Sequence, residues 1–308
     1  MRGQRIISFL PSATEMICAL GLTDRLMGIT HECDYPSDIK NKPIVVHGIL
    51  PLEHMSQSDI DLSVSERLKQ GLSLYQVDEA LIKKIAPDLI VTQDLCQVCA
   101  PSGNEVTQLL KELTSKPEVL SLTPKSLHEI FENIQAIAKA TDSLLEATKL
   151  IASAVARLEK LSALTKKIPS RPRVFCLEWV DPVYCSGHWV PEMVEIAGGE
   201  DKLGRKGADS VRIAWEDVLK WQPEVLIIMP CGYSLKKATE VAQQLSTYQG
   251  WRDLPAVREK RAYVVDANSY FARPGPRVVE GTELLAHLIH PKDCHWTGAK
   301  EAFAPLKN

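Results

Sequence analysis

A stretch near residue 80 is repeated near residue 216, and this internal repeat constrains the possible fold more than any other feature. Residues 79–96 combine a short helical pattern, the corner Pro87-Asp88, a run of strand-forming residues and a loop that ends in cysteine. Residues 216–232 repeat this order around Pro223-Glu224. Coincidence could produce two such blocks in an α/β protein, but the order and the loop cysteine both match. The repeat therefore predicts two similar α/β halves.

A second pair of matching segments precedes the repeated blocks. Residues 5–10 read as a strand that leads into a helical pattern at 14–21, and residues 173–177 lead likewise into 191–198. Strands that alternate with helices favour two Rossmann-like lobes with central, mostly parallel sheets. Ligands of such sheets bind at loops after the carboxyl ends of the strands, so we expect a ligand cleft between the lobes.

The longest helical signal lies between the two halves. Apolar residues at three- and four-residue spacing run through residues 126–166, with a break expected near Thr141-Asp142-Ser143. We expect a loosely ordered tail at the polar, weakly patterned end of the chain. The predicted organisation is an N-terminal α/β lobe over 1–125, a connecting helix over 126–168, a C-terminal α/β lobe over 169–290 and a tail over 291–308.

Composition excludes several classes of protein. The chain has 308 residues, of which 45% are hydrophobic and 24% charged, and its net charge of −3 does not favour nucleic-acid binding. No apolar run approaches the ~20 residues of a membrane helix, so membrane insertion is not expected. The first apolar stretch, residues 6–10, is broken by Pro11-Ser12 without a recognisable signal-peptide or lipidation motif. We therefore expect a cytoplasmic protein whose eight cysteines are reduced.

Aromatic and polar side chains gather in the loops that follow the predicted strands. Aromatic walls with a few hydrogen-bonding groups suit a large, partly flat organic ligand, although about half of these aromatics are expected to pack inside their own lobe. The candidate ligand-binding residues are Pro11, Ser12, His31, Asp34, Tyr35, Cys96, Gln97, Trp179, His188, Trp189, Cys231, Gly232, Tyr270, Phe271 and Arg273.

Cys96 and Cys99 have a spacing that is compatible with reduced structural thiols, with a metal site or with redox chemistry. Histidine and cysteine bind zinc and cobalt, so a composite metal site is a further hypothesis, although the sequence does not identify a metal. No nucleophile elbow, phosphate-binding loop, dinucleotide-binding glycine motif or zinc-protease motif is present, so we do not expect an enzyme. The candidate metal ligands are His31, Cys33, Cys96, Cys99, His188 and Cys231.

Four motifs together resemble a known family: Arg5-Ile-Ile-Ser-x-x-Pro11-Ser12-x-Thr14-Glu15, Asp34-Tyr35-Pro36, Pro87-Asp88-Leu-Ile-Val and Gly198-Gly199. Over residues 5–290 the chain resembles the class III substrate-binding proteins of vitamin B12 and iron-siderophore ABC transporters, the B12 binders most closely. The resemblance implies two Rossmann-like lobes joined by one long helix, with a corrinoid such as cobalamin in the cleft. It makes Trp189, Tyr270 and Phe271 candidates for contact with the corrin ring, and His188 a candidate for an axial approach to cobalt.

The resemblance also implies docking on a transporter permease through an acidic residue in each lobe, seven positions before the proline of each repeated block. Glu216 occupies this position in the second lobe. The first lobe has Ala80 there, with Glu79 beside it, so Glu79 and Glu216 are the docking candidates. The thiol-rich loops and the lack of a recognised export signal depart from the family pattern and favour a cytoplasmic relative.

The leading functional hypothesis is binding of cobalamin or a related corrinoid for uptake, salvage or handover. One alternative is a protein or enzyme that binds a metal or metal chelate through its histidine and cysteine loops. Another is the substrate-binding component of an ABC transporter for an iron-siderophore.

Overall fold

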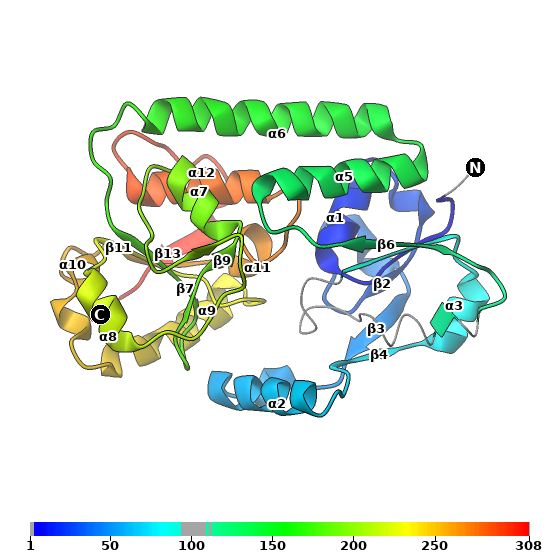
Figure 1. Cartoon of the computed structure of the whole chain (residues 1–308), viewed down its shortest axis with the longest axis horizontal. Helices are drawn as coiled ribbons and strands as arrows, with labels where there is room; N and C mark the ends of the chain where they lie inside the picture. Colours follow the sequence, from blue (N-terminus) through cyan, green and yellow to red (C-terminus); the bar gives the residue numbers. More distant parts are fainter. Residues whose placement is uncertain (1–2, 94–108, 111–112, 308) are drawn as a thin grey trace. The chain divides into compact units, whose positions relative to one another are not determined.

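The computed structural model describes residues 3–93, 109–110 and 113–307. These residues belong to two compact units, each with its own sheet (Figure 1). The first unit comprises Met1–Pro124 and His128–Ser153, and the second comprises Lys125–Leu127 and Ala154–Asn308. Both units are α/β, as the internal repeat predicts.

The first unit is built on a six-stranded sheet in the order β4-β3-β2-β1-β5-β6. Neighbouring strands run parallel except at one edge, where β4 pairs antiparallel with β3. Strands β1 and β5 are buried along their whole length, which is typical of parallel strands with both faces covered. The strands are β1 (Ile6–Ser8), β2 (Leu26–Thr30), β3 (Ile44–Gly48), β4 (Tyr75–Val77), β5 (Leu89–Gln93) and β6 (Glu118–Leu122). The helices are α1 (Pro11–Ala19), α2 (Gln57–Lys69) and α3 (Glu79–Ile85), with α5 (Leu127–Thr141) and the start of α6 (Leu144–Thr165) after the sheet.

The second unit is built on a five-stranded sheet in the order β13-β12-β11-β7-β8. The three central strands, β12, β11 and β7, run parallel, and the edge strands β13 and β8 are antiparallel to their neighbours. The strands are β7 (Val174–Trp179), β8 (Tyr184–Cys185), β11 (Val225–Ile228), β12 (Ala262–Val265) and β13 (Phe303–Pro305), and a separate short pair is formed by β9 (Gly187–His188) and β10 (Arg205–Lys206). The helices are α7 (Val190–Ile196), α8 (Trp215–Trp221), α9 (Leu235–Ala242), α10 (Pro255–Arg258), α11 (Ala267–Tyr270) and α12 (Val278–Ile289).

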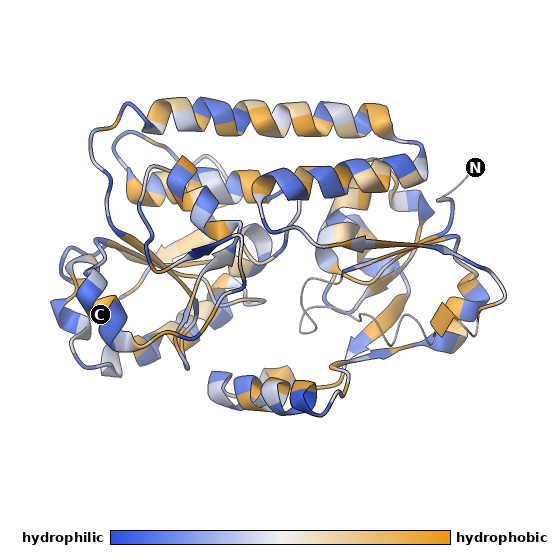
Figure 2. Cartoon of the chain, viewed as in Figure 1, coloured by the Kyte–Doolittle hydropathy of each residue, from blue (hydrophilic) through white to orange (hydrophobic). Residues whose placement is uncertain are grey.

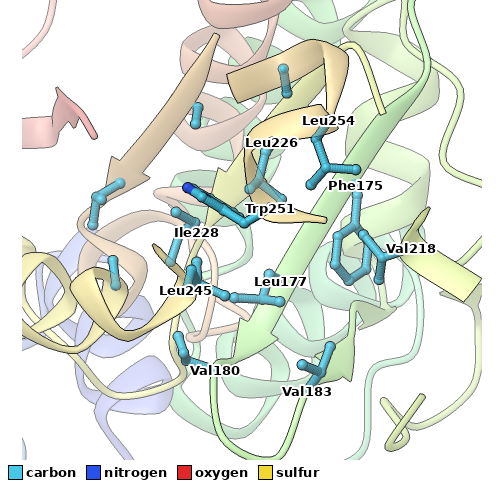
Figure 3. Close-up of a cluster of buried hydrophobic side chains, with 14 of the residues drawn as sticks. Phe175, Leu177, Val180, Val183, Val218, Leu226, Ile228, Leu245, Trp251 and Leu254 are labelled. Carbon is cyan, nitrogen blue, oxygen red and sulfur yellow. The ribbon is translucent and has the colours of Figure 1, made fainter. Parts of the chain in front are cut away.

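Alternate residues of the central strands face different helices, so both faces of the second sheet are covered. Phe175, Leu226 and Ile228 pack into a core with residues of α8, α9 and α10, and Trp251 closes this core (Figure 3). Val174, one position from Phe175, instead points toward α7 and α12, where Gly199 permits a close approach of the chain. The core fixes the strands whose carboxyl ends carry the predicted ligand loops.

The repeated block has the same local structure in both units. Helices α3 and α8 each end at a residue with left-handed backbone geometry, Ala86 (φ 50°) and Gln222 (φ 52°). The acidic residue after the following proline then binds the start of the parallel strand. Asp88 accepts a hydrogen bond from the Arg5 amide at 3.0 Å, and Glu224 accepts one from the Arg173 amide, also at 3.0 Å. The proline and the acidic residue thus join each helix to its sheet, which accounts for their presence in both repeated blocks.

The helical segment after the first sheet is interrupted where the sequence indicates a break. Helix α5 ends at Thr141, Asp142 adopts a φ of 56°, and α6 begins at Leu144. The Thr141 hydroxyl donates to the Ile137 carbonyl and contacts the Ser143 hydroxyl, which satisfies polar groups at the break. Hydrophilic and hydrophobic residues alternate along α6, as expected of an amphipathic helix with one solvated face (Figure 2).

Residues 291–307 are ordered, which corrects the expectation of a loose tail over 291–308. Strand β13 pairs antiparallel with β12, and the Phe303 ring packs edge-on to Tyr263 at 6.2 Å. Cys294 is buried, and its carbonyl is 2.9 Å from Nδ1 of His287 in α12. A three-residue strand is too short to produce a periodic sequence signal, so pairing and packing, rather than local pattern, order this segment.

Candidate functional site

Three loops meet at the carboxyl edge of the second sheet because β7, β11 and β12 run parallel. Trp179 ends β7, residues 229–234 follow β11, and residues 266–277 follow β12. Backbone hydrogen bonds join neighbouring loops: the Cys231 amide donates to the Glu178 carbonyl at 3.1 Å, and the Asn268 amide donates to the Tyr233 carbonyl at 3.2 Å. This edge is where an open α/β sheet places its ligand site.

An aromatic pair lies at this edge. The rings of Trp179 and Tyr233 pack edge-to-face, with centroids 5.4 Å apart and planes inclined by 62°. Tyr233 is buried, whereas Trp179 is half-buried. Tyr233 is not among the predicted ligand residues, although its loop is. The predicted Cys231 and Gly232 are both exposed in the same loop, where Gly232 has a φ of 74° that favours glycine.

Trp189 and Phe271 pack inside the second unit. Trp189 is 5% exposed, and its indole nitrogen donates to the Phe271 carbonyl at 2.9 Å. Phe271 is 2% exposed. These two side chains therefore fall among the aromatics that were expected to pack within their own lobe. A role for either in contacting the ligand stays a prediction.

Tyr270 and Arg273 occupy the loop after β12. Tyr270 ends α11 and is half-buried, and its ring packs perpendicular to that of Trp296 with centroids 5.8 Å apart. Arg273 is only 8% exposed, so its side chain is buried. Trp296 comes from the segment that was expected to be a loose tail. It was missed because its proximity to Tyr270 depends on the pairing of β13 with β12.

His188 is held in a strained and defined position. Its φ is 51°, which is rare for a residue with a β-carbon, and its amide donates to the Ala208 carbonyl at 2.8 Å. The ring stacks on Trp189 with centroids 5.5 Å apart, and its Nε2 atom lies 3.0 Å from a carboxylate oxygen of Asp209. Burial lowers the pKa of His188 despite the nearby Asp209 carboxylate, which favours a neutral imidazole at neutral pH.

Two carboxyl groups near the start of the segment that carries His188, those of Glu178 and Asp201, were not among the predicted site residues. Burial raises the pKa of Glu178 to about 7 and that of Asp201 to about 6. Glu178 accepts a hydrogen bond from the Gly187 amide at 3.1 Å, and Asp201 accepts from the Leu203 and Gly204 amides at 3.0 and 2.9 Å. The Glu178–Gly187 bond ties the segment that carries His188 to strand β7, and Asp201 ties it there as well by accepting from the Cys176 amide of β7 at 3.3 Å.

In the first unit, the predicted residues follow two neighbouring parallel strands. Pro11 and Ser12 form the first turn of α1 after β1, and Ser12 is buried. His31, Asp34 and Tyr35 follow β2 and are all exposed, Tyr35 by 48%. Strands β1 and β2 are adjacent and parallel, so these two loops lie at one edge of the sheet.

The predicted Cys96 and Gln97, together with Cys99, lie outside the described residues. Within the described ranges, no group of three or more His, Cys, Asp or Glu side chains could hold a metal ion. Cys33, another candidate ligand, has its sulfur 3.2 Å from the Thr14 hydroxyl. The hypothesis of a metal at Cys96 and Cys99 therefore stays a prediction.

The two docking candidates lie at the starts of equivalent helices. Glu79 begins α3 and its carboxylate is 4.0 Å from the Lys83 ammonium, whereas Glu216 is the second residue of α8 and is exposed. A surface hollow of about 610 Å³ lies elsewhere, on the outer face of α9. It contains none of the predicted ligand residues and no aromatic side chain, so we do not assign the ligand to it. It is lined by Leu235, Lys236, Thr239, Glu240, Gln243 and Glu301.

Comparison with known proteins identifies relatives over nearly the whole chain. The family profile described as periplasmic binding protein matches residues 6–269. An uncharacterized ABC transporter substrate-binding lipoprotein of Bacillus subtilis, YvrC, is 24% identical over 94% of this chain and 80% of its own length. A vitamin B12-binding protein of Vibrio vulnificus is 23% identical over 91% of this chain and 88% of its own length. A periplasmic heme-binding protein of Pseudomonas aeruginosa has the same fold, with a TM-score of 0.72 and 18% identity over 99% of this chain and 98% of its own.

These comparisons correct the predicted location. The expectation of a cytoplasmic protein is wrong, because the matching family is periplasmic and YvrC is a lipoprotein. The expectation depended on the first residues of the sequence, which do not determine where the protein works. Among the helices in the described ranges, none combines the length and the apolar character that crossing a membrane requires.

Proposed function

This chain belongs to the periplasmic binding protein family, and from that premise we propose that it binds cobalamin or a related corrinoid outside the cytoplasm. The observation that carries the proposal is the set of aromatic and polar loops at the carboxyl edge of the second sheet, where the half-buried Trp179 ring packs on the buried Tyr233 ring. An aromatic surface beside backbone and side-chain hydrogen-bonding groups suits a broad, partly apolar macrocycle. The B12-binding relatives support a corrinoid as the ligand class.

We further propose that the loops of the first unit contribute polar contacts to ligand binding. His31, Asp34 and Tyr35 are exposed at the carboxyl end of β2, where they are accessible to a solute. The relatives also support a role in delivery to an ABC transporter, rather than catalysis, for this chain. Glu79 and Glu216 are the proposed contacts with the permease, since both lie in the first turn of equivalent helices.

Heme or another metal chelate is the second candidate ligand. It is favoured by the same aromatic edge and by the neutral imidazole of His188, since neutral imidazole is a ligand for iron and cobalt. The Asp209 carboxylate beside Nε2 is the kind of partner that orients a metal-binding histidine. An iron-siderophore is the remaining alternative within the same transporter class.

The test is a spectroscopic titration of the purified, reduced protein with hydroxocobalamin, cobinamide and hemin, with calorimetry in parallel. We expect saturable binding of the two corrinoids, with weaker binding of hemin. Tighter binding of hemin would replace the corrinoid with heme as the ligand. No saturable binding of any of the three would overturn the proposal of a tetrapyrrole-type ligand.

Elemental analysis of the same preparation, purified without a histidine tag, tests the metal hypothesis for Cys96 and Cys99. A bound metal near stoichiometric amounts, in protein that binds no corrinoid, would favour the alternative of a metal-binding protein.

A further inference from the structure

A lysine lies beside the aromatic pair of the second unit. The ammonium group of Lys237, in helix α9, is 4.5 Å from the centroid of the Tyr233 ring. The Tyr233 ring in turn packs edge-to-face with Trp179. The three side chains thus form a continuous group, here called the Trp179–Tyr233–Lys237 group, that joins the ends of β7 and β11 to α9.

Backbone hydrogen bonds fix the middle of this group. The Tyr233 amide donates to the Pro230 carbonyl at 3.1 Å, and the Tyr233 carbonyl accepts from the Asn268 amide at 3.2 Å. The Met229 amide donates to the Leu177 carbonyl at 2.9 Å, which binds the start of the loop to β7. Tyr233 is only 6% exposed, so its ring is a fixed support for the lysine.

A cation over an aromatic face is attracted to the ring electrons, and this attraction restricts an otherwise flexible lysine. Lys237 is half-buried, whereas its neighbour Lys236 is exposed and lines the hollow on the outer face of α9. Two consecutive lysines therefore have different environments. One is held against the aromatic pair at the carboxyl edge of the sheet, and the other faces solvent.

We propose that Lys237 binds an anionic group, a phosphodiester or a carboxylate, at the periphery of the flat ligand that the Trp179–Tyr233–Lys237 group contacts. The inference deepens the proposed function and rests on it, because it names the chemical feature that this site recognises. Ammonium groups bind phosphate and carboxylate oxygens through charge-assisted hydrogen bonds. Arg273 lies buried in the adjacent loop after β12, since β12 is the parallel neighbour of β11.

Three ligands distinguish the possible anions. Cobalamin carries one phosphodiester in its nucleotide loop, cobinamide lacks that group, and heme carries carboxylates. The variants are Lys237→Gln, which removes the charge, Lys237→Arg, which keeps it, and the matched control Lys236→Gln, which removes an equal charge one residue away. Dissociation constants are measured by titration at low and high salt, and thermal unfolding confirms that each variant is folded.

We expect Lys237→Gln to weaken binding of cobalamin by about 10- to 100-fold, the range of a hydrogen bond to a charged group, and to reduce its dependence on salt. Binding of cobinamide should change by less than about 2-fold, because cobinamide lacks the recognised anion. Lys237→Arg and Lys236→Gln should both bind cobalamin nearly as the wild type does. If hemin is the ligand that binds, the same loss should appear with hemin and identify the anion as a carboxylate.

An equal loss for cobalamin and cobinamide would overturn the inference, because Lys237 would then only support the Tyr233 ring. An unchanged affinity of the Lys237→Gln variant for both cobalamin and hemin would also overturn it. Failure of the wild type to bind any of the three ligands would instead defeat the proposed function, and the inference with it. The proposed function survives the first two outcomes, so the two failures are distinguishable.

Discussion

At the scale of a single residue, Glu178 makes the stability of the second unit depend on pH. Its pKa is raised to about 7 because burial disfavours the charged form, and the Gly187 amide and the Ser210 side chain offset this only in part. Although the residue as a whole is only half-buried, its carboxyl group receives these hydrogen bonds within the fold. The folded protein therefore holds a proton at pH values above 4.5, where the unfolded chain, with a pKa of 4.5 for this group, has released it.

The sign of the effect follows from this difference. Between about pH 4.5 and 7 the folded state binds more protons than the unfolded state, so the free energy of unfolding should fall as pH rises through this window. The loss from Glu178 should be on the order of 2–3 kcal/mol, and the Glu178→Gln variant should lack it. Urea denaturation at several pH values from 5 to about 8 measures both slopes. Asp201, whose pKa is raised from 3.8 to about 6, adds a slope of the same sign between about pH 3.8 and 6, which remains in the variant. Equal slopes in the wild type and the variant would contradict the prediction.

The burial of Trp189 predicts how its substitution changes stability. Its side chain is buried and its indole nitrogen binds the Phe271 carbonyl, so Trp189→Ala should leave a cavity and an unpaired acceptor. We expect a loss of about 3–5 kcal/mol in the free energy of unfolding. The control Trp189→Phe keeps most of the volume and should lose less. A Trp189→Ala variant that is as stable as the wild type but binds corrinoid weakly would instead place the ring in contact with the ligand.

The residues of the candidate site were predictable by location but not by side-chain environment. The strands could be recognised in the sequence, and the loops that follow them could therefore be located. Trp179, Cys231 and Tyr270 were placed in these loops, and all three lie at one edge of a sheet. The burial of Trp189 depends on a hydrogen bond to a residue 82 positions away, which no local pattern encodes. The same holds for the contact of Trp296 with Tyr270.

At the scale of elements, the repeated helix–corner–strand unit was the most predictable part of the fold. A proline followed by an acidic residue marks the end of a helix and the start of a strand. In the structure the acidic side chain accepts a hydrogen bond from a backbone amide at the start of the neighbouring parallel strand. The short strands β8, β9, β10 and β13 were not predicted, because two or three residues cannot produce a period. Their pairing depends on segments that are distant in sequence.

The left-handed residues that end α3 and α8 offer a test at this scale. Ala86 and Gln222 have nearly the same backbone angles, which glycine adopts without the steric cost of a β-carbon. Ala86→Gly should therefore raise the free energy of unfolding by about 0.5–1 kcal/mol, the cost of the left-handed geometry less the greater entropy that glycine loses on folding. Gln222→Gly should gain less, because the Gln222 side chain donates to the Leu219 carbonyl at 2.7 Å.

The control is Ala152→Gly, at an exposed position within helix α6, where glycine should instead cost about 1 kcal/mol. Chemical denaturation of the three variants gives the comparison. Destabilisation by Ala86→Gly as large as that by Ala152→Gly would show that the left-handed geometry does not limit the end of α3.

At the scale of the whole molecule, the division into two α/β units followed from the repeat, but its position along the chain did not. The boundary between the units falls at Ser153 and Ala154, inside the continuous helix α6. A sequence pattern identifies a helix without indicating which of its turns pack on which core. Each unit nevertheless has its own cluster of buried side chains, one around Ile90 and one around Leu226.

Separate cores predict separate unfolding transitions, and the internal repeat supplies a matched pair of probes. Ile90 in β5 and Leu226 in β11 occupy equivalent positions, three residues after the proline of each block, and both are 0% exposed. Ile90→Ala and Leu226→Ala should each remove about 2–5 kcal/mol from the unit that contains the substitution. In calorimetry we expect two transitions, with Ile90→Ala lowering one midpoint and Leu226→Ala lowering the other. A single transition that both substitutions shift equally would mean that the chain unfolds as one cooperative body, with the helix that crosses the boundary transmitting the loss from each core to the other.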